Sequence, residues 1–275
     1  MSLSRAEAIL ESLGIDRPED IDLEMVAWSL GAKVKYRPLC SCEARICGHG
    51  NKAIITVDDR KSARRVRFSL AHELGHWTHH RERLLICRSV DIGKSSGSRR
   101  DATDPEKVAD RFASELILPS YILHPMLKGY RTLNLKTMRE VGSAFNASLT
   151  ATAIRIMQSN TFHAMIVCHR PGKKPWFERA DCVPDRWFPK ATLDCESYAK
   201  EVLANKTEQV HPRKIGADAW FDRPEAERYE VSEQSFPLPN NEVLTLLTFS
   251  DPAMMEEQRE RRQYGLSIDP AIRVR

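Results

Sequence analysis

The sequence predicts an α+β protein: a mainly helical first domain with a small sheet, followed by a smaller α+β domain. Three observations carry this prediction. Apolar residues recur at helical spacing in several segments before residue 160, and two β-branched runs interrupt them. After residue 160, proline and aromatic residues become more frequent and short strand-like runs replace the helical pattern. A length of 275 residues fits two modest domains, and 41% apolar residues suffice for their cores.

Charge and composition exclude several classes of protein. The 42 Lys and Arg residues against 38 Asp and Glu leave a net charge of +4, which does not single out nucleic acid as the partner. No apolar run approaches the ~20 residues that span a bilayer, and the N-terminus lacks the pattern of a signal peptide, so we expect no membrane partner. Seven cysteines are an odd number in a chain too long to need disulfides, so we expect a cytoplasmic protein.

The first elements follow from a capping signal and from β-branched runs. Ser4 and Glu7 form a capping box, which predicts a helix at the N-terminus. A second helix fits residues 22–30. Residues 34–36 and 52–57 are predicted as strands, with a loop that contains three cysteines between them.

Two longer helices follow. Residues 62–79 contain no proline and place Val66, Leu70, Leu74 and Trp77 on one face, which predicts a helix. Residues 88–103 are polar and rich in Gly and Ser, which predicts a loop. Asp104 and Pro105 then supply the N-cap and first residue of a helix that stops at Pro119.

The remaining elements divide at about residue 160. Residues 136–146 and 149–158 predict two short helices. Beyond them, four strands are predicted at residues 164–168, 176–178, 229–232 and 243–249. A hairpin connection at 239–241 is predicted to lead into the last strand.

The chemistry of the chain centres on a His-Glu-x-x-His motif in the long helix. His72 and His76 are four residues apart, so they project from one helix face and can bind one Zn²⁺ at roughly 2.0–2.1 Å. Glu73 points away from this pair and can reach a water on the metal, where it would act as general base. The same spacing also arises by chance on solvated helices, but the small and apolar neighbours here favour a metal site.

A catalytic zinc needs a third protein ligand. His79 and His80 are predicted as helix-end residues facing solvent, because His80 lies two turns from His72. Glu106, in the first turn of the next helix, is the stronger candidate for the ligand. Asp110 follows at i+4 on the same face and is predicted to orient a ligand histidine.

Two segments resemble the ImmA/IrrE family of metallopeptidases, whose fold is zincin-like. Arg67-Phe68-Ser69-Leu70-Ala71-His72-Glu73-Leu74-Gly75-His76 resembles the family's R-F-S/T-L-A-H-E-L-G-H segment. Residues 106–119 resemble its E-x-x-A-N-x-F-A-x-x-L-L-x-P segment, with Asp110 in place of the commoner Asn. Residues 141–148 are similar to the family's helix-turn-helix-like element, so the resemblance covers about residues 1–160.

The resemblance implies a domain plan and a function. A zincin-like metallopeptidase domain would occupy residues 1–130, a helix-turn-helix-like segment 131–160, and an α+β module 161–275, where family members often carry a GAF-like module. His72, His76 and Glu106 would bind Zn²⁺, or Mn²⁺, and Glu73 would be the catalytic base. The family typically cuts a helix-turn-helix repressor and so releases stress-response or mobile-element genes.

The expected function is therefore a zinc-dependent endopeptidase that acts on a helix-turn-helix repressor. The alternative is a non-catalytic, metal-stabilised module that binds a repressor or DNA without cleaving it. For the transition state, Tyr121, His124 and Arg67 are chemically able donors, although no spacing places them. The strand at 53–57 is predicted either to pair with an extended substrate or to pair internally.

Weaker signals favour structural interpretations. Cys40, Cys42, Cys47 and His49 have poor spacing for a second zinc, and Cys87 is a weak candidate for a thiolate that blocks the open metal position. Five basic residues in 60–67 fit a solvated helix start better than a contact to an acidic or DNA-bound substrate. Direct nucleic-acid binding through 149–157 is not favoured, because Arg155 is its one basic residue.

Overall fold

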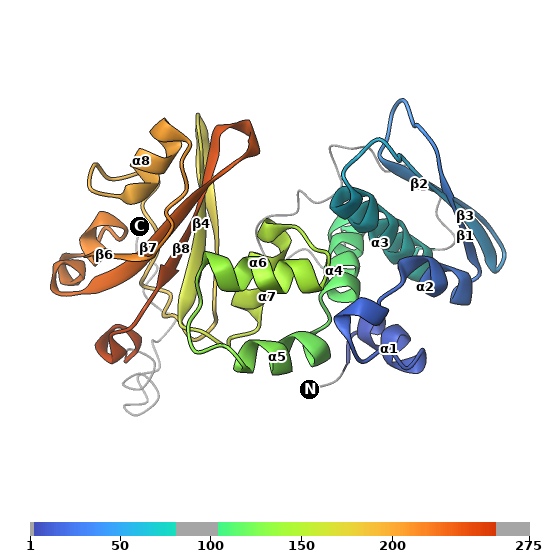
Figure 1. Ribbon diagram of the computed structural model, residues 1–275, viewed down its shortest axis with the longest axis horizontal. Coiled ribbons are helices and arrows are strands. Elements are labelled where there is room, and N and C mark those ends of the chain that lie inside the picture. The colour runs from blue at the N-terminus through green and yellow to red at the C-terminus, as the bar shows by residue number, and fades with distance from the viewer. Residues whose placement is uncertain (1–2, 81–103, 257–275) are drawn as a thin grey trace, which may run out of the picture. The chain divides into compact units, whose positions relative to one another are not determined.

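The chain forms two compact units, Met1–Thr161 and Phe162–Arg275. A computed structural model describes residues 3–80 and 104–256, and each unit is considered by itself (Figure 1). The fold class is α+β, as predicted, with helices prominent in the first unit and a larger sheet in the second. The predicted loop at 88–103 and Cys87 lie outside the described residues.

The first unit begins with two short helices and a small sheet. The helix α1 (Arg5–Ser12) starts with the predicted capping box, in which Ser4 and Glu7 bond to each other's backbone. The other helices of this unit are α2 (Leu23–Ser29), α3 (Ala63–His79), α4 (Pro105–Ile117), α5 (Ser120–Lys128), α6 (Leu135–Ala144) and α7 (Leu149–Gln158).

The small sheet has the strand order β1-β3-β2, formed by β1 (Ala32–Tyr36), β2 (Ala44–His49) and β3 (Lys52–Val57). The strand β3 pairs in parallel with β1 and antiparallel with β2. It is therefore the central strand and pairs internally, so its proposed pairing with a substrate is wrong: both of its edges are already bonded. The strand β2 was not predicted, because its cysteines and glycine resemble a loop.

Close contacts hold α3 between the sheet and α4. Gly48 of β2 lies against the ring of Trp77, where an added Cβ would come within 2.4 Å of a ring carbon. On the opposite side, a Cβ at Gly75 would lie 2.8 Å from the Cα of Ala109 in α4. Small residues at both contacts let α3 approach its neighbours closely, and this approach places the site described below.

The helices α6 and α7 pack on the rest of the unit. Arg155 of α7 is buried, and its guanidinium donates hydrogen bonds to the carbonyl of Leu118 and the hydroxyl of Ser120. It therefore satisfies the carbonyl that ends α4. The one basic side chain of the candidate recognition segment is thus used inside the fold, which supports packing rather than DNA reading.

The second unit is built on an antiparallel sheet of order β5-β4-β8-β7-β6. Its strands are β4 (Ala164–Arg170), β5 (Lys173–Arg179), β6 (Arg213–Gly216), β7 (Glu230–Leu238) and β8 (Glu242–Thr248), with the helix α8 at Tyr198–Asn205. The predicted hairpin connection joins β7 to β8 at 239–241. Trp187 and Trp220 are fully buried in the core, as expected of core aromatics.

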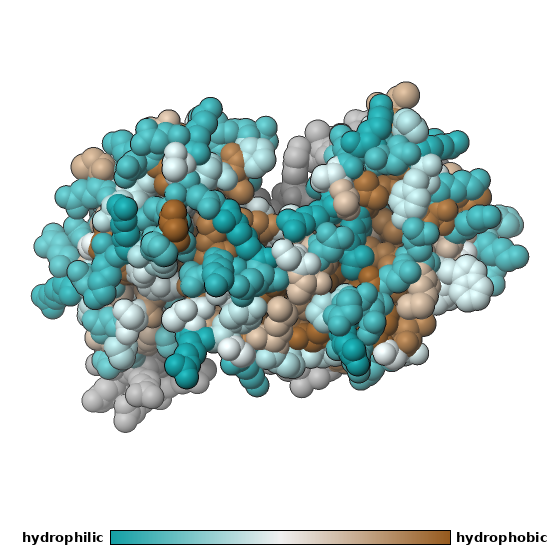
Figure 2. All heavy atoms as spheres, in the orientation of Figure 1, coloured by the Kyte–Doolittle hydropathy of each residue, from teal (hydrophilic) through white to brown (hydrophobic). Residues whose placement is uncertain are grey.

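The surface is largely hydrophilic in the view of Figure 2, with hydrophobic residues exposed in patches. Within the part of the chain that the structure describes, no helix is long and apolar enough to cross a membrane.

Candidate metal centre

Three predicted ligands converge between α3 and α4. His72 and His76 lie one turn apart on α3, and their Nε2 atoms are 3.1 Å apart. Glu106, in the first turn of α4, places Oε2 3.2 Å from His72 Nε2 and Oε1 3.4 Å from His76 Nε2. Among the described residues, His72, His76 and Glu106 form the group of His, Cys, Asp or Glu side chains that could hold a metal ion, with potential ligand atoms within 4.8 Å of one another.

The spacing of these atoms fits a tetrahedral metal site. With bonds of about 2.0–2.1 Å, two tetrahedral ligands of Zn²⁺ lie about 3.3–3.4 Å apart. The 3.1 Å between the two Nε2 atoms and the 3.2 Å from Glu106 Oε2 to His72 Nε2 are close to two edges of such a tetrahedron. Glu106 reaches His76 Nε2 through its other oxygen, Oε1, at 3.4 Å. Two imidazoles and one carboxylate leave the fourth position open, which is the ligand set of catalytic rather than structural zinc.

Asp110 orients His72. Its Oδ1 lies 2.9 Å from His72 Nδ1, and both side chains are buried. A carboxylate at this distance accepts the Nδ1 hydrogen, so the lone pair of a neutral His72 stands on Nε2 and faces Glu106. Burial disfavours a charged ring, but the hydrogen bonds with Asp110 and Glu106 prevail and raise the pKa of His72 to about 9.

The two glutamates have different environments. Hydrogen bonds with His72 and His76 hold the pKa of Glu106 well below its ordinary value, so this carboxylate is ionised. Glu73 follows His72 in α3 and is fully buried, and its charge favours the protonated form of His72. A buried carboxylate beside the ligand group is a candidate for proton transfer.

His80 is closer to the centre than the sequence indicates. Its Nδ1 lies 3.4 Å from Nδ1 of His76, and its ring is half-buried rather than facing solvent. The i, i+4 spacing from His76 is the signal that could have revealed this contact. His79 is exposed, but its ring packs edge-on against Phe112 and its Nδ1 contacts the Gly75 carbonyl.

The other candidate donors are engaged elsewhere. The Tyr121 hydroxyl donates to the carbonyl of Ile15, and burial raises its pKa. The Arg67 guanidinium donates to the carbonyl of Ile21 at 2.9 Å. The structure thus directs both polar groups to the N-terminal backbone and does not bring them to the three ligand candidates. Their part in the transition state stays a prediction.

The cysteine cluster does not form a second site. Cys40 and Cys47 are exposed, whereas Cys42 is buried, and none of them joins a group of converging ligands in the described chain. These cysteines are therefore interpreted as ordinary residues of the loop and of β2, and not as zinc ligands.

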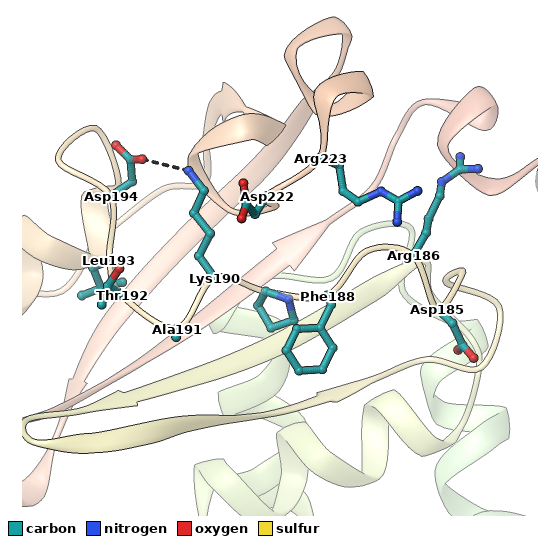
Figure 3. A pocket seen from close by; sticks show the side chains of 11 residues that line it. Asp185, Arg186, Phe188, Lys190, Ala191, Thr192, Leu193, Asp194, Asp222 and Arg223 are labelled. Carbon is teal, nitrogen blue, oxygen red and sulfur yellow. Dashed lines mark hydrogen bonds and ion pairs between the residues drawn. The ribbon is translucent and has the colours of Figure 1, made fainter. Parts of the chain in front are cut away.

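The second unit contains a cavity of about 760 Å³, shown in Figure 3. Its charged lining balances three acidic side chains, Asp185, Asp194 and Asp222, against three basic ones, Arg186, Lys190 and Arg223. Lys190 forms an ion pair with Asp194 at 3.0 Å, drawn as a dashed line in the figure. Trp176, Trp187 and Trp220 do not line this cavity.

Fold and site together define a class: an α+β protein in which two histidines of one helix and a glutamate of the next form a potential metal centre, as in metallopeptidases. Residues 27–157 match the sequence model of a peptidase family, described as the IrrE N-terminal-like domain. This match, to just under half of the chain, agrees with the resemblance that the sequence motifs indicate. It supports peptidase activity in general.

Structural comparison agrees on the fold. A transcriptional regulator of Mycobacterium tuberculosis aligns with 96% of this chain and 92% of its own, with a TM-score of 0.57. The identity is 13%, so the likeness concerns the fold alone. No curated protein matches the sequence.

Proposed function

We propose that the chain is a zinc-dependent endopeptidase with His72, His76 and Glu106 as metal ligands and Glu73 as general base. The convergence of three side chains whose potential ligand atoms lie within 4.8 Å of one another carries this proposal. The match of residues 27–157 to a peptidase family supports it. Mn²⁺ is a second possible ion, since imidazole and carboxylate ligands also suit it.

Each side chain of the site has a separate role in peptide hydrolysis. A bound Zn²⁺ would polarise the scissile carbonyl and lower the pKa of water toward about 7. The Glu73 carboxylate accepts the proton that the attacking water loses and later returns it to the leaving amine. Asp110 holds His72 in the tautomer whose Nε2 faces the centre. The burial of His72, Glu73 and His76 limits the access of bulk water.

The proposed substrate is a helix-turn-helix repressor, cleaved in the cytoplasm to release stress-response or mobile-element genes. Two observations support this substrate class: the family match and the sequence resemblance to repressor-cleaving peptidases.

The test combines two variants with the repressor encoded beside the gene. Glu73→Gln should retain zinc but abolish the cut, because the amide cannot accept a proton. Glu106→Ala should lower zinc content and cleavage together. Glu11→Gln, which removes an exposed carboxylate of α1, is the control and should leave both unchanged.

Each outcome separates the proposal from its alternative. Zinc content that is undiminished in Glu106→Ala would exclude Glu106 as a ligand. If Glu73→Gln still regulates the repressor as the wild type does, the protein is a non-catalytic, metal-stabilised module that acts by binding.

A further inference from the structure

The small sheet of the first unit has one face packed and one face open. Tyr36 bonds to Glu24 of α2, and Gly48 lies against Trp77 of α3, so both helices cover the inner face (Figure 1). Strand alternation assigns Ala53, Ile55 and Val57 to that inner face, where all three are buried. Their neighbours in β3 therefore point to the opposite, outer face.

The outer face is basic. In register across the strands, Lys33 and Cys47 flank Ile54, and Lys35 and Arg45 flank Thr56. His49 stands opposite Lys52 at the end of the sheet. The outer face thus comprises eight residues, none of them acidic and all exposed except Thr56: Lys33, Lys35, Arg45, Cys47, His49, Lys52, Ile54 and Thr56.

These charges differ from the basic run that opens α3. Arg60 pairs with Asp58 at 2.8 Å, and Lys61 and Arg65 both contact the buried Glu43. That run is largely neutralised within the fold. By contrast, Lys33, Lys35, Arg45 and Lys52 form no ion pair within residues 3–80 and 104–256.

The sheet also concentrates the charge of the chain. Residues 31–57 contain five Lys or Arg residues and one acidic residue, Glu43, a balance of +4 that equals the net charge of all 275 residues. The rest of the sequence is neutral in sum. A near-balanced composition therefore conceals a single-signed surface, which attracts a polyanion.

We propose that this outer face docks duplex nucleic acid through its phosphate backbone. The edge strands lie two strand spacings apart, about 9.5 Å, and carry Lys33 and Lys35 on one side and Arg45 and His49 on the other. This separation falls between the widths of the minor and major grooves, about 6 and 12 Å. Long side chains in two rows can therefore reach phosphates on both sides of a groove.

A duplex suits the face better than a single strand does. Proteins that bind single strands stack the bases on aromatic side chains. The outer face contains no Phe, Tyr or Trp, whereas Lys and Arg are the side chains that contact phosphates. The recognition is expected to be independent of base sequence, because contacts from Lys and Arg to phosphates carry no sequence information.

The test measures binding of a 20-base-pair DNA of arbitrary sequence to the full chain by fluorescence anisotropy across a salt series. The triple variant Lys33→Gln, Lys35→Gln, Arg45→Gln should bind at least tenfold more weakly at low salt. Its slope of log K against log salt should be shallower by about 2.7, at about 0.9 for each lost phosphate contact. Circular dichroism confirms that the variant is folded.

The control removes the same charge elsewhere. Lys173→Gln, Lys174→Gln, Lys200→Gln changes three exposed lysines of the second unit and should retain the wild-type affinity and slope. Equal losses in both triple variants, or no measurable binding by the wild type, would overturn the proposal. The proposal would also be overturned if the outer-face triple variant lost binding to a polyglutamate peptide but retained binding to the duplex. That outcome would assign the face to an acidic protein. The peptidase function stands or fails independently of this test.

Discussion

One carboxylate that is not a ligand controls the geometry of the candidate metal centre. Asp110 fixes the tautomer and ring orientation of His72 through a single buried hydrogen bond of 2.9 Å. Without it, the ring could rotate about its Cβ–Cγ bond, and Nε2 would lose its alignment with His76 and Glu106. The position of a side chain behind the ligands is therefore part of the site.

Asp110→Ala should weaken zinc binding by about 10- to 100-fold, as is usual when such a partner of a ligand histidine is lost. Asp110→Asn should retain most of the affinity, because its amide oxygen can still accept the Nδ1 hydrogen. Competition with a chromophoric chelator measures both values. Equal affinities in the alanine variant and the wild type would show that His72 needs no orienting partner.

A second buried carboxylate organises the other unit. Glu233 accepts hydrogen bonds from the indole of Trp220 at 2.8 Å and from the backbone N–H of Ala199 at 2.7 Å. Ser197 and Ser235 also donate to it. These donors join β7 to the start of α8 and to the core, although burial raises the pKa of Glu233.

Glu233→Gln should destabilise the second unit by about 1–3 kcal/mol, because in either orientation the new amide NH₂ faces an N–H group, of Ala199 or of Trp220, that can only donate. Denaturant unfolding followed by tryptophan fluorescence measures the change. Glu230→Gln, at an exposed position of the same strand, is the matched control and should change stability little.

At the scale of elements, the approach of α3 to α4 sets the distance between the histidines and Glu106. Gly75 lies against Ala109 so closely that no Cβ fits between the helices. The glycine of the motif is thus explained by packing, since the helical backbone at this position imposes no special dihedral angle.

Gly75→Ala should separate α3 from α4 and reduce both stability, by about 1–3 kcal/mol, and zinc affinity. Intrinsic helix propensity predicts the opposite sign, because alanine favours helices over glycine by about 1 kcal/mol. Thermal unfolding and zinc titration measure the two effects. A variant as stable as the wild type would show that the helices can shift without loss.

The helices α1 and α5 are joined by Glu7, whose carboxylate accepts from the backbone N–H of Ser4 and of Ser120. Burial disfavours its charge, but these hydrogen bonds prevail and lower the pKa of Glu7 below its ordinary value of 4.5. A lowered pKa stabilises the fold above pH 4.5, and this stabilisation is lost as the pH falls through the folded-state value.

Wild type should therefore be more stable than Glu7→Gln at neutral pH, and the difference should shrink below about pH 4.5. Thermal unfolding of both proteins between pH 3 and 7 checks this. A difference that is constant across the series would show that Glu7 acts through its shape and not its charge.

The sequence predicts elements with strong periodicity and fails where local signals conflict. The apolar stripe of α3 and the β-branched run of β3 were sufficient for both elements. The helix α5 was missed because Pro119 signals a stop and Pro125 lies inside it, and β2 because it looks like a cysteine loop. The strand β2 forms by pairing with β3, and no local pattern reports that pairing.

The same limit applies to the candidate site. Spacing within one helix was enough to place His72 beside His76, and the i+4 relation put Glu106 and Asp110 on one face. The partner of Tyr121, the carbonyl of Ile15, is 106 residues away in sequence, so no local pattern could assign it. Contacts that depend on how distant segments pack lie beyond sequence spacing.

At the scale of the whole molecule, the two units have separate cores, and the candidate metal centre belongs to the first unit alone. Calorimetry should therefore show two unfolding transitions, one for each unit. A chelator should lower the Tm of the transition that belongs to the first unit. Zinc at 100 times its Kd stabilises the folded state by about 2.7 kcal/mol, which corresponds to about 5–10 °C in a unit of this size.

The variant Glu233→Gln tests the other unit. It should lower the Tm of the second unit's transition, which the chelator leaves unchanged. A single transition that moves in both experiments would show that the units unfold as one. In that case, metal binding to the first unit would also stabilise the second.

The ligands of the candidate centre stand on both sides of a long stretch of chain: 29 residues separate His76 from Glu106. An ion held by both helices would act as a covalent cross-link does, because it restricts the unfolded chain as well as joining the folded one. Cross-links that close loops of 15 and 100 residues are worth about 3 and 4.7 kcal/mol in the chain-entropy model. Loss of the ion would thus remove this restriction on the unfolded chain, so metal supply would control how readily the first unit unfolds and becomes accessible to cellular proteases.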